Sequence, residues 1–418
     1  MLARWLGLAA LAAAGAGLAG CAGGAPSSNV AEATGGQLAI YSSLPLQGPS
    51  AGISRQIVGG EKLALRDAGG RAGDFKIGPV WLDDANPQSG EWSPDITSTN
   101  AKTAAQDTST IAYIGDFNSA ATAISLPLTN AAGILQVSPA SPYQGLTRSL
   151  DAGQDEPERF YLSGKRTFAR LQPGDMVQAA AQVRLMSSLG VHRVYVIDDQ
   201  DPFEIPLADL VASGAASAGI ELVAHDSIAT SVGATYSGEV EKVLESKAQA
   251  VFFAGGGGAG TVALWRALHS ADPHLLLLGS SSMAGEAFTS QIGAAASETY
   301  LTTPVLPIGL YPLSGQRVLR DYAKTFAGEA GPYVLYGYEA MTVVLDAIRA
   351  AGVHGDDRQS VIDGLFAVRN RNSVLGRYSI EANGETTLSR YGVDRVRHGR
   401  PVFDRAIDVP PAGPSPGG

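Results

Sequence analysis

The sequence of 418 residues contains a single cysteine, Cys21, so it can form no intrachain disulfide and no cysteine-based metal site. Its six histidines show no ligand spacing with carboxylates, and it lacks a G-x-S-x-G segment, so a metal site and a serine hydrolase are both unsupported. Positive charge is also scarce, because 30 lysines and arginines against 40 aspartates and glutamates leave a formal net charge of -10. Binding of nucleic-acid phosphates needs a basic surface, so nucleic acid is not expected as a partner.

Long apolar runs are equally scarce, and the longest begins at Leu6, ends at Ala19 and follows Arg4. It is too short and too rich in alanine and glycine to span a bilayer comfortably, and a basic start followed by small residues is typical of an export signal. Cys21 comes directly after Leu18-Ala19-Gly20, which resembles the lipobox of bacterial lipoproteins. That resemblance implies cleavage before Cys21 and lipid on its sulfur and new N-terminus. We therefore expect a signal peptide at residues 1–20 and a protein anchored by lipid to the extracytoplasmic face of the cell membrane.

The two ends of the remaining chain are poor in residues that could pack. Residues 21–36 carry the cysteine and then mostly Ala, Gly, Ser, Pro and Asn, which predicts a flexible tether. Residues 410–418 read PPAGPSPGG, which predicts a disordered tail. The nearly 400 residues between them are enough for two domains.

Strand-like and helix-like segments alternate from residue 37 onward. The first half shows apolar strand patterns at 37–42, 75–82, 111–115 and 133–138, and helical patterns at 50–68, 99–108 and 120–132. A charged, turn-rich stretch at 149–166 follows, and the pattern then restarts with helices at 175–190, 206–218, 236–247 and 261–270 and strands at 194–198, 220–225, 250–254 and 275–279. Such alternation predicts an α/β fold of two doubly wound halves, each built on a parallel sheet.

The last part of the chain predicts two further helices and a hairpin. The helices are expected at 336–350 and from Gln359 onward. The strands are expected at 376–380 and 387–393, around Asn383-Gly384, whose residues tolerate the positive φ of a tight turn. Because ligands of open parallel sheets bind beyond the carboxyl ends of the strands, two such halves predict a cleft that can close around a solute.

Five segments, in order, resemble the leucine/isoleucine/valine-type solute-binding proteins of ABC transporters, which have the type I periplasmic-binding fold. The resemblance runs from about Gln37 to Ile407. The segments are 44–49 (LPLQGP), 60–70 (GEKLALRDAGG), 82–87 (LDDANP), 113–122 (YIGDFNSAAT) and 136–147 (QVSPASPYQGLT). The resemblance implies two Rossmann-like lobes joined by a three-segment hinge, with crossings expected near Arg166, Thr303 and Leu375. The first lobe would then comprise 37–166 and 304–375, and the second 167–303 and 376–409.

Several residues are candidates for ligand binding on the first lobe. Ser119 follows a strand and begins a helix, so its hydroxyl and the nearby N–H groups can hold a carboxylate or cap the helix. The resemblance implies backbone contacts from Ala140, with Ser141 beside it. Asn118 could meet an anionic or amide-bearing solute, as could Arg55.

The expected second-lobe contacts are Phe203, in the place of an aromatic residue, and Gly256, Gly257 and Ser281 on two later loops. Here the chain departs from the family pattern. Pro142 replaces a threonine, a later aromatic position falls in the glycine run, and serines stand where an acidic partner for an α-ammonium is expected. A buried ammonium without a carboxylate is costly, so Asp116 is a possible substitute partner.

A rival interpretation comes from residues 255–260 (GGGGAG), which satisfy G-x-G-x-x-G and would fit a dinucleotide-dependent enzyme. That fingerprint normally lies in the first βαβ unit, which favours the binding protein. We therefore expect a monomeric, non-enzymatic protein without a cofactor that delivers a small polar solute, an amino acid or a related amide or carboxylate, to an ABC permease. An exported sensor for a membrane receptor is the alternative, because it would have the same fold.

Overall fold

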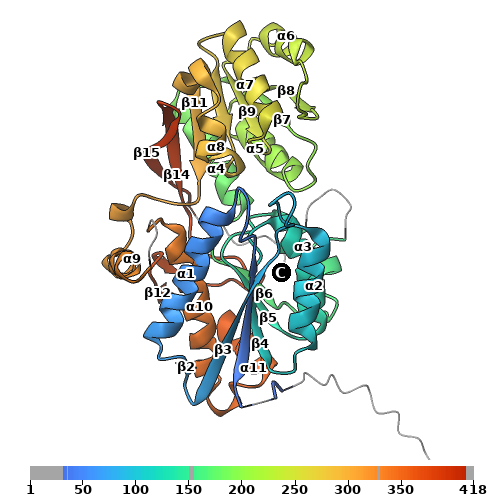
Figure 1. Cartoon of the computed structure of the whole chain (residues 1–418). Helices are drawn as coiled ribbons and strands as arrows, with labels where there is room; N and C mark the ends of the chain where they lie inside the picture. Colours follow the sequence, from blue (N-terminus) through green and yellow to red (C-terminus); the bar gives the residue numbers. More distant parts are fainter. Residues whose placement is uncertain (1–31, 35, 150–154, 327–329, 411–418) are drawn as a thin grey trace, which may run out of the picture.

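The computed structural model describes residues 32–34, 36–149, 155–326 and 330–410, which form two α/β lobes (Figure 1). The expected signal peptide, Cys21 and nearly all of the expected tail lie outside these ranges. Within them, no helix combines the length and the apolar character that a membrane crossing requires.

The first lobe is built on a six-stranded sheet in the order β2-β3-β1-β4-β5-β6, in which only β2 runs antiparallel to its neighbour. Its strands are β1 (Leu38–Leu44), β2 (Arg71–Ala72), β3 (Phe75–Asp83), β4 (Thr110–Ile114), β5 (Leu135–Ser138) and β6 (Phe168–Arg170). Its helices are α1 (Ala51–Asp67), α2 (Pro94–Gln106), α3 (Ser119–Ala131), α9 (Leu313–Thr325), α10 (Tyr333–Ala350) and α11 (Arg358–Phe366). A small ladder, β12 (Arg371–Asn372) with β13 (Arg377–Tyr378), lies beside them.

Helices cover both faces of this sheet because successive residues of its strands point to opposite sides. In β1, Leu38 and Ile40 pack in the core under α1 and α10, whereas Ala39 and Tyr41 pack toward α2. The helices α1 and α10 approach closely at Gly60 and Gly337. A Cβ at Gly60 would lie 2.1 Å from the Val334 carbonyl oxygen, so only glycine permits this contact.

The second lobe is built on a seven-stranded sheet in the order β15-β14-β11-β10-β9-β7-β8. Its strands are β7 (Arg193–Asp198), β8 (Glu221–Ser227), β9 (Ala250–Ala254), β10 (Leu276–Gly279), β11 (Thr299–Thr303), β14 (Arg390–Arg397) and β15 (Arg400–Asp408). Its helices are α4 (Asp175–Ser188), α5 (Ile205–Ser217), α6 (Ser237–Glu245), α7 (Ala259–Ala271) and α8 (Glu286–Thr289). In β9, Phe253 faces the core under α6 and α7 while Phe252 faces α4 and α5, so this sheet is also buried on both sides.

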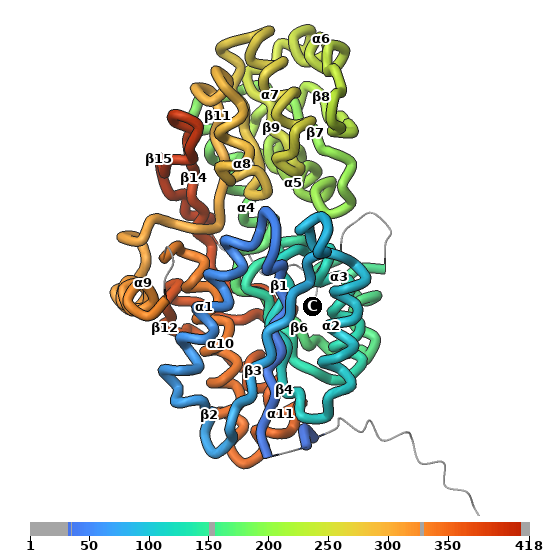
Figure 2. The backbone as a smooth tube through the Cα atoms, in the orientation of Figure 1, coloured from blue at the N-terminus to red at the C-terminus, as the bar shows by residue number. Residues whose placement is uncertain are grey.

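The chain passes between the lobes three times, and Figure 2 traces its path. The first crossing follows β6, which ends at Arg170, and so comes slightly later than the expected position near Arg166, because β6 pairs with β5 and extends the first sheet. The second follows β11 at Thr303, where it was expected, and Leu306 already packs in the first-lobe core.

The third crossing comes after Leu388, and the expectation near Leu375 is corrected. Tyr378 and Ile380 are buried in the first-lobe core, whereas β14 belongs to the second sheet. The first lobe thus comprises 37–171 and 304–388, and the second comprises 175–303 and 390–409.

The expected hairpin around Asn383-Gly384 is also corrected. A turn forms there, closed by a single bridge between Ile380 and Thr386. The strand that follows instead pairs with β15, through a turn at His398 and Gly399, whose φ angles are 52° and 75°. The turn at His398 and Gly399 therefore fixes the register between β14 and β15. Its two residues adopt the positive φ angles that were expected of Asn383-Gly384.

Candidate functional site: the interlobe cleft

A cavity of about 310 Å³ opens between the lobes, where the carboxyl ends of the parallel strands of the two sheets face each other. This volume falls in the usual range for a small-molecule site. We call it the interlobe cleft. It is lined by Ser50, Trp92, Phe117, Asn118, Ser119, Ala120, Ala140, Pro142, Gln172, Asp175, Gln178, Asp201, Phe203, Glu204, Leu207, Ser281, Ser282, Pro304 and Tyr333.

The first-lobe wall is centred on the start of α3. Ser119 is the first residue of this helix, and its hydroxyl accepts a hydrogen bond from the Tyr143 N–H at 3.2 Å, which leaves its own proton available to a ligand. Asn118 stands at the N-cap without capping the helix, and its Oδ1 is buried without a partner. This wall therefore offers a hydroxyl, the first N–H groups of a helix and one unpaired amide oxygen.

The next loop contributes less than the resemblance implied. Ala140 lines the cleft, but its N–H donates to Ser138 Oγ at 3.0 Å and is already occupied. Ser141 adopts a positive φ of 57° and its hydroxyl donates to the Asp116 carbonyl oxygen at 3.0 Å. Its side chain thus points into the lobe, and Ser141 is not among the cleft-lining residues.

Asp116 lies behind the cleft and is fully buried. Its carboxylate accepts hydrogen bonds from Tyr113, at 3.0 Å, and from Ser125. Burial raises the pKa of this carboxyl to about 7, against the opposing effect of the two hydroxyls. Its position does not suit it as the substitute ammonium partner. Arg55 is exposed on α1 and also lies outside the cleft lining.

The second-lobe wall is acidic. Asp201 and Glu204 lie on the loop between β7 and α5, and Asp175 and Gln178 lie on the first turn of α4. Phe203, on the same loop, lines the cleft as expected. Its ring also meets Tyr143 of the first lobe edge-on, with centroids 4.9 Å apart, so it joins the two lobes.

Burial governs the charge on this wall. Glu204 accepts a hydrogen bond from Ser282 through Oε1, while its Oε2 is buried without a partner. Desolvation, with the nearby charges of Asp199 and Asp201, raises the pKa of Glu204 to about 7, although the Ser282 hydroxyl opposes the rise. Desolvation and the charge of Glu204 also raise the pKa of Asp175 well above its usual range.

The glycine run serves packing in this fold. The N–H of Gly256 donates to Asp199 Oδ2 at 2.8 Å, and a Cβ at Gly257 would lie 2.8 Å from the Cβ of Phe288. Neither glycine is among the cleft-lining residues, whereas Ser281 is. The expectation of ligand contacts from Gly256 and Gly257 is therefore not met.

Several cleft residues were not identified from the sequence. The acidic run at 198–204 (DDQDPFE), directly after a second-lobe strand, was the available signal for Asp201 and Glu204. Other cleft residues come from elements that only the tertiary fold brings together, including α4, the start of α10, the hinge and a loop. Among them are Trp92, Gln172, Asp175, Gln178 and Tyr333.

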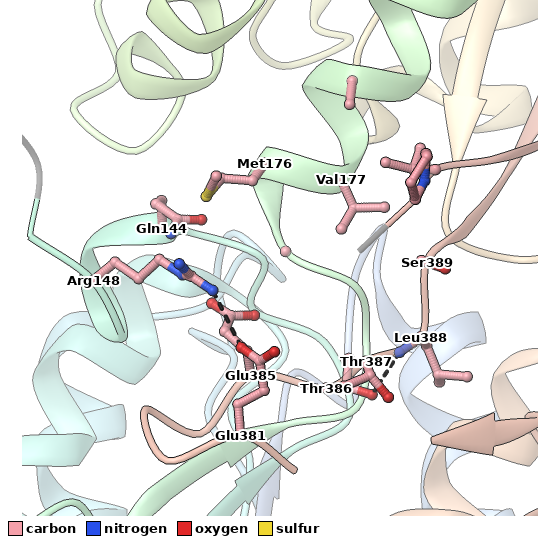
Figure 3. Close-up of a pocket in the computed structure, with 14 residues that line it drawn as sticks. Gln144, Arg148, Met176, Val177, Glu381, Glu385, Thr386, Thr387, Leu388 and Ser389 are labelled. Atoms are coloured by element: carbon pink, nitrogen blue, oxygen red, sulfur yellow. Dashed lines mark hydrogen bonds and ion pairs between the residues drawn. The ribbon is translucent and has the colours of Figure 1, made fainter. Parts of the chain in front are cut away.

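Two further cavities flank the hinge. One, of about 220 Å³, is drawn in Figure 3 and lies between the start of α4, the third crossing and the loop that carries Gln144 and Arg148. Its charged groups are mutually paired, because Arg148 contacts Glu381 at 3.2 Å and Glu385 contacts Arg170 at 3.1 Å. The other, of about 460 Å³, is lined largely by apolar and proline residues.

Unpaired buried polar atoms distinguish the interlobe cleft from these cavities. Among the described residues, four such side-chain atoms belong to cleft-lining residues: Asn118 Oδ1, Gln178 Oε1 and Nε2, and Glu204 Oε2. The cavity in Figure 3 has one, Gln144 Nε2, and the larger hinge cavity has none. Because buried polar groups are normally hydrogen-bonded, their concentration in the cleft points to a polar ligand there.

Comparisons with known proteins agree with this architecture. The model of the periplasmic binding protein family matches residues 42–400. A sequence search of curated proteins finds no significant match. Among solved structures, a leucine-binding protein, LivK, from Thermotoga maritima has a TM-score of 0.73 at 20% identity and covers 89% of this chain and 99% of its own.

Two other solved structures show the same fold with different ligands. The branched-chain amino acid binding protein LivJ from Streptococcus pneumoniae, in complex with isoleucine, has a TM-score of 0.70 at 17% identity, over 89% of this chain and 99% of its own. A solute-binding protein of an ABC transporter from R. palustris, in complex with benzoate, has a TM-score of 0.68 at 16% identity and covers 90% of this chain and 98% of its own. The chain therefore belongs to the periplasmic binding protein family and has the two-lobed fold of its branched-chain amino acid-type members.

Proposed function

We propose that this chain captures a small polar solute in the interlobe cleft and delivers it to an ABC permease. The observation that carries the proposal is the set of four buried polar atoms without partners on residues that line a cavity between two hinged lobes. Relatives of this fold bind isoleucine in one case and benzoate in another, which supports a solute of that size. No covalent chemistry is required, since the transport cycle needs only binding and release.

The mechanism is hinge closure. The solute first binds one wall, and closure then brings the second wall onto it, which removes water and satisfies the unpaired groups. Three chain crossings make the hinge, and the ring contact of Phe203 with Tyr143 joins the second lobe to the first. A permease that recognises only the closed form would then receive loaded protein.

We further propose an exported, monomeric protein that acts without a cofactor and is anchored through lipid on Cys21. The apolar run and the Leu-Ala-Gly-Cys sequence support the anchor. A Cys21→Ser variant should move from the membrane fraction to the soluble fraction. Equal membrane retention of this variant would contradict lipid anchoring.

The capture function can be tested by titrating the protein comprising residues 22–418 with amino acids, amines and carboxylates. The tryptophan fluorescence, to which Trp92 in the cleft contributes, is followed during the titration. Binding should change this signal in the wild type and raise the melting temperature, but should leave the fluorescence of a Trp92→Phe variant nearly constant. Ser119→Ala should weaken affinity by about 2- to 10-fold, the value of one hydrogen bond.

The matched control is Ser217→Ala, which removes an exposed hydroxyl on α5 outside the cleft and should not change affinity. An unchanged affinity in Ser119→Ala would remove Ser119 from the site. A ligand that raises the melting temperature equally when the cleft is mutated would place capture elsewhere.

A further inference from the structure

We infer that the captured solute carries a protonated amine and that Glu204 is its ion-pair partner, supported by Asp175 and Asp201. This assignment rests on the proposed function, because it names the ligand chemistry of the same cleft. It also replaces Asp116, which the sequence had offered for this role.

The charge of the cleft lining is the first argument. Three of its described residues carry carboxyl groups, and none is a lysine, arginine or histidine. The buried Arg170 is not among the cleft-lining residues. Its two terminal nitrogens donate to the carbonyl oxygens of Ser141 and Tyr143 and to Glu385, whereas its Nε has no partner. A ligand with only a carboxylate would enter an acidic, partly dehydrated cavity without a cation to meet it, which is unfavourable.

The unpaired atoms are the second and independent argument. Three of the four are acceptors, namely Asn118 Oδ1, Gln178 Oε1 and Glu204 Oε2. Gln178 is 1% exposed, and neither the oxygen nor the nitrogen of its side-chain amide has a hydrogen-bond partner. A ligand in the cleft could supply the missing partners. An ammonium has three N–H donors and no acceptor, which matches a site dominated by acceptors. A quaternary ammonium has no N–H donor and does not match it.

The remaining walls fit the rest of such a ligand. Trp92, Phe117 and Tyr333 on the first lobe and Phe203 on the second are aromatic. Aromatic faces attract cations and cover apolar groups, so an amine with an apolar or aromatic body suits the cavity. Ser119 and the α3 N-terminus could also hold a carboxylate. The amine is therefore the required group, and a carboxylate is permitted but not required.

The test compares ligands that share a carbon skeleton and differ in charge. One set is phenethylamine, L-phenylalanine and 3-phenylpropanoate, and the other is 3-methylbutylamine, L-leucine and 4-methylpentanoate. Affinities for the lipid-free chain, residues 22–418, are measured by calorimetry near neutral pH. In at least one set the amine-bearing members should bind about 30-fold or more tightly than the carboxylate-only member.

Variants then identify the partner. Glu204→Gln keeps the side-chain shape and should lower affinity for the amine by about 30-fold or more. Asp201→Asn should weaken it less. The control Asp209→Asn removes a charge from an exposed position on α5 outside the cleft and should leave affinity unchanged. Melting of the ligand-free variants confirms that each is folded.

Each result decides the matter. A carboxylate-only ligand that binds as tightly as its amine counterpart would overturn the inference while leaving solute capture intact. An amine that binds Glu204→Gln as well as wild type would overturn Glu204 as the partner. If no member of either set binds, both the inference and the proposed capture of solutes of this size are overturned.

Discussion

The two lobes differ in the acids that they present to the interlobe cleft, because its described lining includes acidic residues of the second lobe and none of the first. The first lobe encloses Glu61 and Asp116 in its interior, where Ser42 and Trp81 donate to Glu61 at 3.0 and 2.8 Å. The second lobe brings Asp175, Asp201 and Glu204 to the interlobe cleft, and Glu204 keeps an unpaired oxygen there.

The difference shows that burial and a raised pKa do not by themselves mark a binding site. Burial raises the pKa of Glu61 to about 8, and burial with the charges of Asp116 and Asp83 raises that of Asp84 to about 8. Neither residue lines the cleft. Asp84 has no partner for either oxygen and is held neutral inside the lobe. Only the unpaired acid that also faces a cavity is open to a ligand.

The largest difference between the lobes should appear when one acid is removed from each and the stability of the two variants is compared. Asp116→Ala should lower the free energy of unfolding by about 2–4 kcal/mol, because the hydroxyls of Tyr113 and Ser125 lose their buried acceptor. Glu204→Ala should cost about 1 kcal/mol or less, since the exposed Ser282 regains water. Urea denaturation measures the loss of stability in both variants. Ligand affinity should fall more in Glu204→Ala than in Asp116→Ala. Equal stability losses would contradict the distinction between the lobes.

The charge on Glu204 should make ligand binding in the cleft depend on pH. With a pKa of about 7, Glu204 is partly protonated near neutral pH, and an ammonium favours its ionised form. Affinity for an amine should therefore rise about tenfold between about pH 6 and about pH 8, with release of a proton. Asp175, Asp199 and Asp201 face the same group and favour its protonated form, while Arg170 lowers the pKa of Asp175.

Calorimetry at several pH values, in buffers of different ionisation enthalpy, measures both the affinity and the proton release. Glu204→Gln should flatten the profile. An affinity that falls as the pH rises through this window would contradict the assignment of Glu204.

The smallest expected effect concerns the contact between the lobes. Phe203→Ala removes the edge-on ring contact with Tyr143, and such pairs contribute about 0.5–1.5 kcal/mol, so affinity should fall by about 2- to 10-fold. Small-angle scattering should show a more open ligand-free protein. Phe403→Ala, on the partly exposed β15, is the matched control and should change neither quantity. If Phe203→Ala leaves affinity and shape unchanged, the ring contact has no part in closure.

The fold was largely predictable from the sequence because its strands and helices have strong periodic patterns. The segments at 111–115, 194–198 and 250–254 were each placed within a residue of β4, β7 and β9. The five segments that resemble the family predicted which parts of the chain form each lobe. The crossing points were less predictable, since β6 has three residues and is identified only by its pairing with β5.

The site was only partly predictable, because it is assembled from both lobes and the hinge. Ser119, Asn118 and Phe203 were correctly expected to lie at the cleft, since each follows the carboxyl end of a strand, and their role in ligand binding stays a prediction. Asp116 and Ser141 were placed on the correct loops, but hydrogen bonds turn them inward, which sequence spacing cannot reveal. The acids of the second-lobe wall lie on segments that become neighbours only after folding.

The decisive experiment is a crystal structure of the protein with an amine-bearing ligand from the two matched sets. We expect the ligand in the interlobe cleft, with its nitrogen within about 3.2 Å of a Glu204 carboxylate oxygen and its body against Trp92 or Tyr333. A ligand seated in the hinge cavity of Figure 3, or one whose nitrogen points away from the second-lobe acids, would contradict it.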